Sequence, residues 1–216
     1  MKAVLFDLDG TLADTAADLC YAINCMRTTR GLAPVPLAKT RPVTSSGARG
    51  LLAAGFDMTP QHPDYDAMRT EFLDIYERNV CRETQLFPGM ADLLSALEKM
   101  GIPWGVVTNK AERFTHPLLK GLGLHMRAAC IVGGDTTPHL KPHPASLLAA
   151  SERIALPPSA CVYVGDDERD MIAGRAAGMR VVAAAYGYLG HGREPEQWDA
   201  DLCISEPREI LDFLKR

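Results

Sequence analysis

The sequence lacks the features that would assign it to a membrane or secretory class. No run of about 18 apolar residues occurs in it, and its first apolar stretch, Ala3 to Leu12, contains Asp7 and Asp9. That stretch cannot serve as the core of a signal peptide, and no other segment is long and apolar enough to span a bilayer. We therefore expect no membrane partner and a cytoplasmic location.

Cysteine clusters, basic stripes and low-complexity segments are absent too. The six cysteines are scattered without a CxxC pair, which favours reduced, mostly buried thiols over disulfides or zinc ligands. The formal net charge is −4, and acidic and basic residues are intermixed. Because no basic stripe with interleaved aromatics occurs, we expect no nucleic-acid partner. With 216 residues, 47% of them hydrophobic and 23% charged, the chain is long enough for one core and a small accessory domain.

Short apolar runs alternate with helical patterns along the chain. These runs are residues 3–7, 104–109, 129–132 and 161–165, with 180–184 as a further candidate. Continuous apolarity is typical of strands buried on both faces, and alternation with helices indicates right-handed crossovers in a parallel sheet. The helices are expected at residues 90–99, 111–122, 144–154 and 169–177. The sequence predicts an α/β fold with a doubly wound parallel sheet.

One segment breaks this alternation. Between Asp14 and Met100, helical patterns occur without a buried strand, and prolines interrupt them. We expect an inserted α-helical cap domain at residues 14–87 and a core domain formed by residues 1–13 and 88–216. A cap in this position would close over the site as a lid.

Carboxylates follow two of the predicted strands at their ends. Asp7 and Asp9 leave the end of the first strand, Gly10 permits a tight turn there, and Asp166 follows the strand at residues 161–165. Ligands of an open parallel sheet collect at the carboxyl ends of its strands, so these acids should share one pocket. Carboxylates, water and substrate phosphate are the ligands that Mg²⁺ prefers. We expect Asp7, Asp9 and Asp166 to form a Mg²⁺ site in which Asp7 also acts as the nucleophile.

The remaining strand ends supply groups for phosphate. Thr108 and Asn109 follow the second strand, and Lys141 precedes the helix after the third. Together with the amides of the Gly10 turn, they could neutralise phosphoryl oxygens, while Asp9 could act as general acid and base. Each signal alone is weak, because Asp-x-Asp and Gly-Asp-Asp strings usually form turns or helix caps. Their joint placement at successive strand ends makes coincidence the poorer explanation.

Four strings, in order along the chain, resemble the motifs of the haloacid dehalogenase superfamily. They are Asp7-Leu-Asp-Gly-Thr11, Val107-Thr-Asn109, Lys141-Pro142 and Gly165-Asp-Asp-Glu-Arg-Asp170. The roles that the resemblance implies are nucleophile for Asp7, acid/base for Asp9, phosphate ligand for Thr108, charge clamp for Lys141 and metal ligand for Asp166. It also implies that the backbone carbonyl of Asp9 reaches the metal.

The fourth motif departs from the family pattern at one position. Asp170 matches its second acid and is expected just outside the direct metal ligands, whereas Asp167 stands where a serine is common. This departure leaves open which of the two acids contacts the metal.

Further strings resemble particular phosphatases of the superfamily. Residues 133–144 and 14–18 are similar to those of bacterial phosphoglycolate phosphatases, whereas Tyr186-Gly-Tyr188 and Trp198 are similar to phosphatases of N-acetylmuramic acid 6-phosphate. The resemblance implies a Mg²⁺-dependent phosphomonoester hydrolase that forms an aspartyl-phosphate on a small phosphorylated metabolite. We expect 2-phosphoglycolate first and the amino-sugar phosphate second.

Arg49 is the candidate substrate residue of the cap. It could pair with a substrate carboxylate, and the alternative is an ordinary solvated helix arginine. The substrate-binding set is then Gly10, Arg49, Thr108, Asn109 and Lys141.

Three other functions compete with a phosphatase. A phosphomutase can share the Asp7 and Asp9 pair, a dehalogenase needs neither the metal nor an acid at position 9, and a binding module can keep the fold without chemistry. Because every chemical role has a candidate residue in the sequence, a binding module without chemistry is disfavoured. A monomer and a homodimer are both compatible with the sequence.

Overall fold

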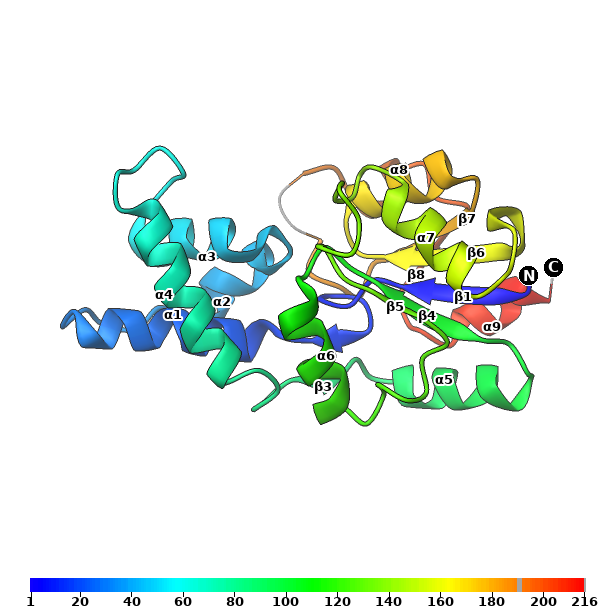
Figure 1. The fold of residues 1–216 in the computed structure, drawn as a ribbon, viewed down its shortest axis with the longest axis horizontal. Helices are drawn as coiled ribbons and strands as arrows, with labels where there is room; N and C mark the ends of the chain where they lie inside the picture. The colour runs from blue at the N-terminus through cyan, green and yellow to red at the C-terminus, as the bar shows by residue number, and fades with distance from the viewer. Residues whose placement is uncertain (190–191, 216) are drawn as a thin grey trace.

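The computed structural model, which describes residues 1–189 and 192–215, contains a six-stranded parallel sheet with helices packed on it (Figure 1). The strands of this sheet are β1 (Ala3–Phe6), β4 (Trp104–Val107), β5 (Ile131–Val132), β6 (Cys161–Gly165), β7 (Arg180–Ala184) and β8 (Leu202–Ile204). They lie in the order β5-β4-β1-β6-β7-β8, and every neighbouring pair is parallel. The predicted α/β doubly wound sheet is confirmed, with β1 between β4 and β6.

Helices cover both faces of the sheet. One face carries α5 (Met90–Lys99), α6 (Glu112–Gly121) and α9 (Glu209–Leu214), and the other carries α7 (Ala145–Arg153) and α8 (Glu168–Ala177). Val4 and Phe6 of β1 pack in the first layer, whereas Ala3 and Leu5 pack in the second. Successive strand side chains point to opposite faces, so a strand covered on both sides is continuously apolar, as the sequence showed.

The predicted residue ranges of the strands and helices agree closely with those in the structure. Helices α5 to α8 differ from the predicted ranges by one residue at most at either end. β5 begins two residues late, yet the Ala129 N–H still donates to the Trp104 carbonyl at 2.7 Å. β8 was not predicted, because it is three residues long at the sheet edge, and Leu202 and Cys203 are only partly buried.

A separate group of helices lies beyond the carboxyl end of β1 (Figure 1). It consists of α1 (Ala16–Thr29), α2 (Leu37–Thr40), the 3₁₀ helix η1 (Arg41–Ser46), α3 (Gly47–Phe56) and α4 (Tyr65–Arg78). Its buried apolar side chains, among them Ile23, Leu51 and Phe72, form a cluster distinct from those of the sheet layers. We call α1 to α4 with η1 the helical group. Two more 3₁₀ turns, η2 (Pro158–Ala160) and η3 (Pro195–Gln197), lie in the sheet part.

The chain enters and leaves the helical group through a two-stranded antiparallel ribbon. β2 (Ala13–Asp14) pairs with β3 (Gln85–Leu86), with Ala13 opposite Leu86. The predicted cap boundaries at residues 14 and 87 fall beside this ribbon, and the division into two domains stays a prediction.

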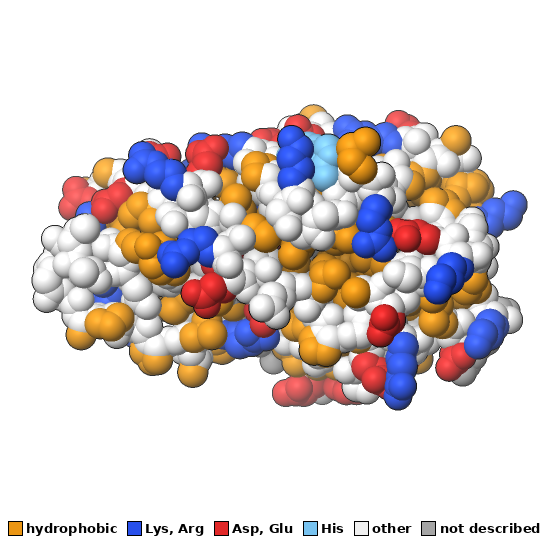
Figure 2. Space-filling model, turned by 90° about the horizontal axis from the view of Figure 1, so that it is seen from below, with side chains coloured by type: hydrophobic (Ala, Val, Ile, Leu, Met, Phe, Trp, Pro, Cys, Tyr) orange, Lys and Arg blue, Asp and Glu red, His pale blue; other side chains and the backbone are white. Residues whose placement is uncertain are grey.

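The distribution of surface charge and the length of the helices agree with the composition of the sequence. Acidic and basic side chains are interspersed rather than gathered by sign on the face that Figure 2 shows. Within residues 1–189 and 192–215, no helix combines the length and apolarity that crossing a bilayer requires.

Candidate active site

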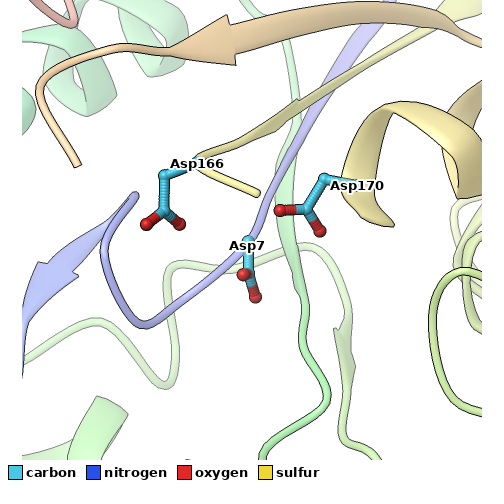
Figure 3. A group of neighbouring side chains, drawn as sticks. All are labelled: Asp7, Asp166 and Asp170. Carbon is cyan, nitrogen blue, oxygen red and sulfur yellow. The ribbon is translucent and has the colours of Figure 1, made fainter. Parts of the chain in front are cut away.

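Three carboxylates converge at the carboxyl ends of the two central strands (Figure 3). Asp7 follows β1, Asp166 follows the neighbouring β6, and Asp170 lies in the first turn of α8. One oxygen of each lies within 4.8 Å of the others, which is close enough for all three to share one metal ion. Asp170, which the sequence placed outside the direct ligands, is therefore part of the cluster.

Lys141 is a buried cation beside this cluster. Its Nζ lies 3.0 Å from Asp7 Oδ1 and 2.7 Å from Asp170 Oδ1, and it contacts the Tyr163 hydroxyl at 2.7 Å. Although burial alone would lower the pKa of Lys141, the carboxylates of Asp170 and Asp7 raise it above the ordinary value. Lys141 therefore remains charged at the end of β1.

The cluster carries more negative charge than Lys141 offsets. Burial, and then the Asp7 and Asp170 charges, raise the pKa of Asp166 well above its ordinary value. Burial also raises the pKa of Asp7 to about 6, against the opposing effect of Lys141. Asp166 accepts hydrogen bonds from Thr11 Oγ1 and the Tyr188 N–H, each 2.9 Å long, and has no cationic partner among the described residues. Three carboxylates around one lysine fit a divalent cation such as Mg²⁺.

Two glycines lie so close to Asp166 that a side chain at either position would overlap with its carboxylate group or its Cβ. Gly10 has φ +87°, and a Cβ there would lie 2.1 Å from Asp166 Oδ2. A Cβ at Gly187 would lie 2.3 Å from the Asp166 Cβ. Gly10 therefore serves the carboxylate as well as the turn, because only a residue without a side chain fits both requirements.

Asp9 directs its carboxylate to a different set of partners. Lys110 Nζ donates to both of its oxygens at 2.9 and 3.1 Å, and Thr15 Oγ1 donates to Oδ1 at 2.5 Å. Lys110 also lies over the ring of Tyr76 in α4, 4.7 Å from its centroid. No role was predicted for Lys110 or Thr15. The only signal for Lys110 is its position directly after Thr108 and Asn109.

Thr108 and Asn109, which follow β4, have different places in the site. Thr108 is buried, and its hydroxyl accepts a 3.2 Å hydrogen bond from the Lys110 N–H. Asn109 Nδ2 donates to the Lys141 carbonyl at 3.0 Å, and the Lys141 N–H donates to Asn109 Oδ1 at 2.9 Å. The Asn109 side chain, which we expected to bind substrate, thus holds the loop that carries Lys141.

Asp167 is not part of the carboxylate cluster. Its Oδ1 accepts the Arg169 N–H at 2.9 Å, which caps α8, and its Oδ2 pairs with the Arg169 guanidinium at 2.8 Å. Arg169 Nη2 in turn donates to the Ser45 carbonyl of η1 at 3.0 Å. Arg169 and Ser45, for which no role was predicted, join the sheet part to the helical group.

A cavity of about 520 Å³ lies between the sheet part and the helical group. The predicted residues in its wall are Asp7, Asp9, Arg49, Thr108, Asn109, Lys141, Asp167 and Asp170. Asp166 and Gly10 are not among the residues that line it. His139 and His143 contact each other with tilted rings, whose centroids are 4.4 Å apart, and do not line it. The structure thus gathers most of the predicted site residues around one cavity.

The sequence and the structure of the chain are both similar to those of known proteins. The model of the haloacid dehalogenase-like hydrolases matches residues 4–184. The chain is 41% identical to an N-acetylmuramic acid 6-phosphate phosphatase of Pseudomonas aeruginosa, over 100% of this chain and 96% of the relative. It is 45% identical to a phosphoglycolate phosphatase of Xanthomonas campestris, over 98% of this chain and 95% of the relative. A crystal structure of a predicted phosphoglycolate phosphatase from Haemophilus somnus superimposes with a TM-score of 0.86 at 28% identity, covering 99% and 97% of the two chains. The chain belongs to the haloacid dehalogenase-like hydrolase family.

Proposed function

We propose that this protein is a Mg²⁺-dependent phosphomonoesterase that transfers a phosphoryl group from a small metabolite to Asp7 and then to water. The observation that carries this proposal is the position of Asp7, which faces the cavity beside buried Lys141 and shares a cluster with Asp166 and Asp170. The names of the relatives, both phosphatases, support the same reaction.

Asp7, Asp166 and Asp170 are the side chains that would hold Mg²⁺. The ion would supply positive charge to the oxygens of the transferring phosphoryl group. The backbone carbonyl of Asp9 remains a further candidate ligand.

In the first half-reaction, an Asp7 carboxylate oxygen attacks phosphorus. The bond between phosphorus and the ester oxygen breaks, and Asp9 donates a proton to that leaving oxygen. Lys141 lies next to the attacking group, and Thr108 lines the same cavity, so both can bind phosphoryl oxygens. The product alcohol leaves, and the phosphoryl group stays on Asp7.

In the second half-reaction, water attacks the phosphorus of the aspartyl-phosphate. Asp9 accepts a proton from that water, the bond between Asp7 and phosphorus breaks, and inorganic phosphate is released. Lys110 and Thr15 fix the orientation of the Asp9 carboxylate for both transfers. We further propose that the helical group is a cap that shields these steps from bulk water.

The two substrates that we consider first both contain a carboxylate. 2-Phosphoglycolate is the expectation from the sequence, and Arg49 in the cavity wall would pair with its carboxylate. N-acetylmuramic acid 6-phosphate is the second candidate, and the cavity volume of about 520 Å³ favours it.

Phosphate release from a panel of phosphomonoesters, with Mg²⁺ and with a chelator, tests the proposal. We expect turnover that requires Mg²⁺, that proceeds without a bisphosphate activator, and that Asp7→Asn abolishes. A phosphomutase would need the activator. Near-full activity of the Asp7→Asn variant would refute the covalent route.

A further inference from the structure

Helix α4 presents one face to the cavity. Tyr65, Arg69, Phe72, Leu73 and Tyr76 line it, and their spacing of four, three, one and three residues places them along one side of a helix. We call these residues the α4 stripe. None of them had a predicted functional role, so the stripe is a part of the cavity wall that the proposed chemistry leaves unused.

Two arginines at the solvent-exposed part of the cavity wall have no counterion among the described residues. The side chains of Arg49 in α3 and Arg69 in α4 form no ion pair or hydrogen bond within the described part of the chain. The other cations of the wall are paired, for example Lys110 with Asp9 and Arg169 with Asp167. Covering a guanidinium without an anion is costly, so an occupant of this end of the cavity should carry negative charge.

Three of the other four residues of the stripe are buried aromatics, and the fourth, Leu73, is partly buried. Tyr65, Phe72 and Tyr76 belong to the apolar cluster of the helical group. The buried Tyr76 hydroxyl has no hydrogen-bond partner of acceptable geometry among the described residues, although Lys110 lies over its ring. Apolar rings with a few polar groups suit a ligand whose body has both apolar faces and hydroxyls.

The length of the stripe sets the size of that ligand. Tyr76 contacts Lys110, the partner of Asp9, and therefore marks the catalytic end. Arg69 lies two turns earlier, or roughly 10 Å along the helix at about 1.5 Å per residue. Helix side chains lean toward the N-terminus, which takes the Arg69 guanidinium further away. In 2-phosphoglycolate, three bonds of about 1.5 Å join phosphorus to the carboxyl carbon, so these atoms are at most roughly 4 Å apart.

We propose that the site binds a phosphorylated sugar acid of hexose size, with its ring against the α4 stripe and its carboxylate on Arg69, assisted by Arg49. This inference rests on the proposed phosphatase function and names its substrate class. The cavity of about 520 Å³ lies within the range of about 300–1,000 Å³ that is ordinary for ligands larger than a two-carbon acid. Arg69 is then a specificity-determining residue.

Two substrates that differ only in a carboxylate-bearing group measure how much the carboxylate contributes to recognition. N-acetylmuramic acid 6-phosphate and N-acetylglucosamine 6-phosphate differ only in the lactyl ether that carries it. We expect the wild type to favour the acid in kcat/KM, and Arg69→Ala to lower kcat/KM for the acid by about 10- to 100-fold while changing that for the neutral sugar little. Arg69→Lys should restore only part of the loss, because lysine lacks the planar fork. Arg78→Ala, on the same helix outside this cavity, is the control and should change neither value.

Three results would overturn the inference. They are equal losses on both sugars in Arg69→Ala, no preference of the wild type for the acid, and a higher kcat/KM for 2-phosphoglycolate than for the sugar acid. Turnover of p-nitrophenyl phosphate separates the two proposals. If that ester is hydrolysed with Mg²⁺ but the preference is missing, only the substrate class is wrong. If no phosphomonoester is hydrolysed, the phosphatase function itself is wrong.

Discussion

Lys141 Nζ lies 3.0 Å from Asp7 Oδ1, and only 3% and 13% of the two side chains are exposed. Even with this cation beside it, burial and the neighbouring acids hold the pKa of Asp7 at about 6. The ion pair therefore only partly offsets the cost of placing a carboxylate at this position. Both removal of the Asp7 charge and binding of Mg²⁺ should therefore stabilise the fold.

Replacing Asp7 with asparagine should separate activity from stability. Loss of the nucleophile should lower kcat by at least about 10³-fold. The pKa shift from 3.8 to about 6 corresponds to roughly 3 kcal/mol that the ionised carboxylate costs the metal-free fold. At pH 8 without Mg²⁺, Asp7→Asn should therefore melt a few degrees above the wild type by calorimetry. At pH 4, where the wild-type carboxyl is protonated in the fold, the difference should disappear. A lower melting temperature at pH 8 would contradict this reading of the site.

The stabilising effect of Mg²⁺ should grow as the pH rises. A raised carboxyl pKa means that the folded metal-free state keeps protons which the unfolded state releases. For Asp7, the free energy of unfolding therefore falls as the pH rises from about 4 to about 6 and stays lower above that. Mg²⁺ must displace those protons from Asp7 and Asp166, whose pKa lies higher still. Melting curves with and without Mg²⁺ at pH 5, 6, 7 and 8 should show a Mg²⁺-induced shift that increases with pH. A shift independent of pH would place the ion elsewhere.

Asp170 and Asp167 should differ in their effect on metal binding. Asp170→Asn removes a carboxylate of the cluster and should weaken Mg²⁺ binding by about 10- to 100-fold. Asp167→Asn keeps a good helix cap at the start of α8, so stability and Mg²⁺ affinity should both stay near wild type. Titration calorimetry on both variants measures the affinities. Equal losses would mean that Asp167 also reaches the ion.

Asn109 should affect catalysis through Lys141. Its amide makes two hydrogen bonds to the Lys141 backbone, and losing them should let Lys141 move away from Asp7, with a fall in kcat of about 10- to 100-fold. Asn24 provides a matched control, because its amide makes the same two bonds to the Val35 backbone, at 3.0 and 2.8 Å. Alanine at either position should cost about 1–2 kcal/mol of stability. Only Asn109→Ala should lower kcat, and a similar kcat loss in both variants would assign the effect to stability.

The sequence could predict the sheet and the acids at its strand ends because both depend on simple periodicity. Strands covered on two faces are continuously apolar, and parallel strands bring their ends together wherever the intervening helices lie. Asp7 and Asp166 follow from that rule alone. β8 does not, because a short edge strand buries too little to leave an apolar run.

The partners of Asp9 could not be predicted in the same way. Lys110 and Thr15 reach Asp9 from two different connecting segments, and Tyr76 comes from α4, so the pairing depends on how the helical group sits over the sheet. The place of Asp170 depends on a single turn. A capping box draws its Oδ2 to the Asp167 N–H at 3.1 Å, while Oδ1 meets Lys141. Side-chain direction of this kind is not encoded in spacing.

The ribbon between β2 and β3 has a consequence for how the protein can change. Because the chain departs at Ala13 and Asp14 and returns beside them at Gln85 and Leu86, everything between forms a loop with adjoining ends. Such a loop can be lengthened, shortened or exchanged without redirecting β1 or α5. Selection on which molecule is recognised can then act on the loop while selection on bond cleavage acts on the sheet. A chimera that carries another relative's residues between those four positions would show whether recognition is inherited with the loop.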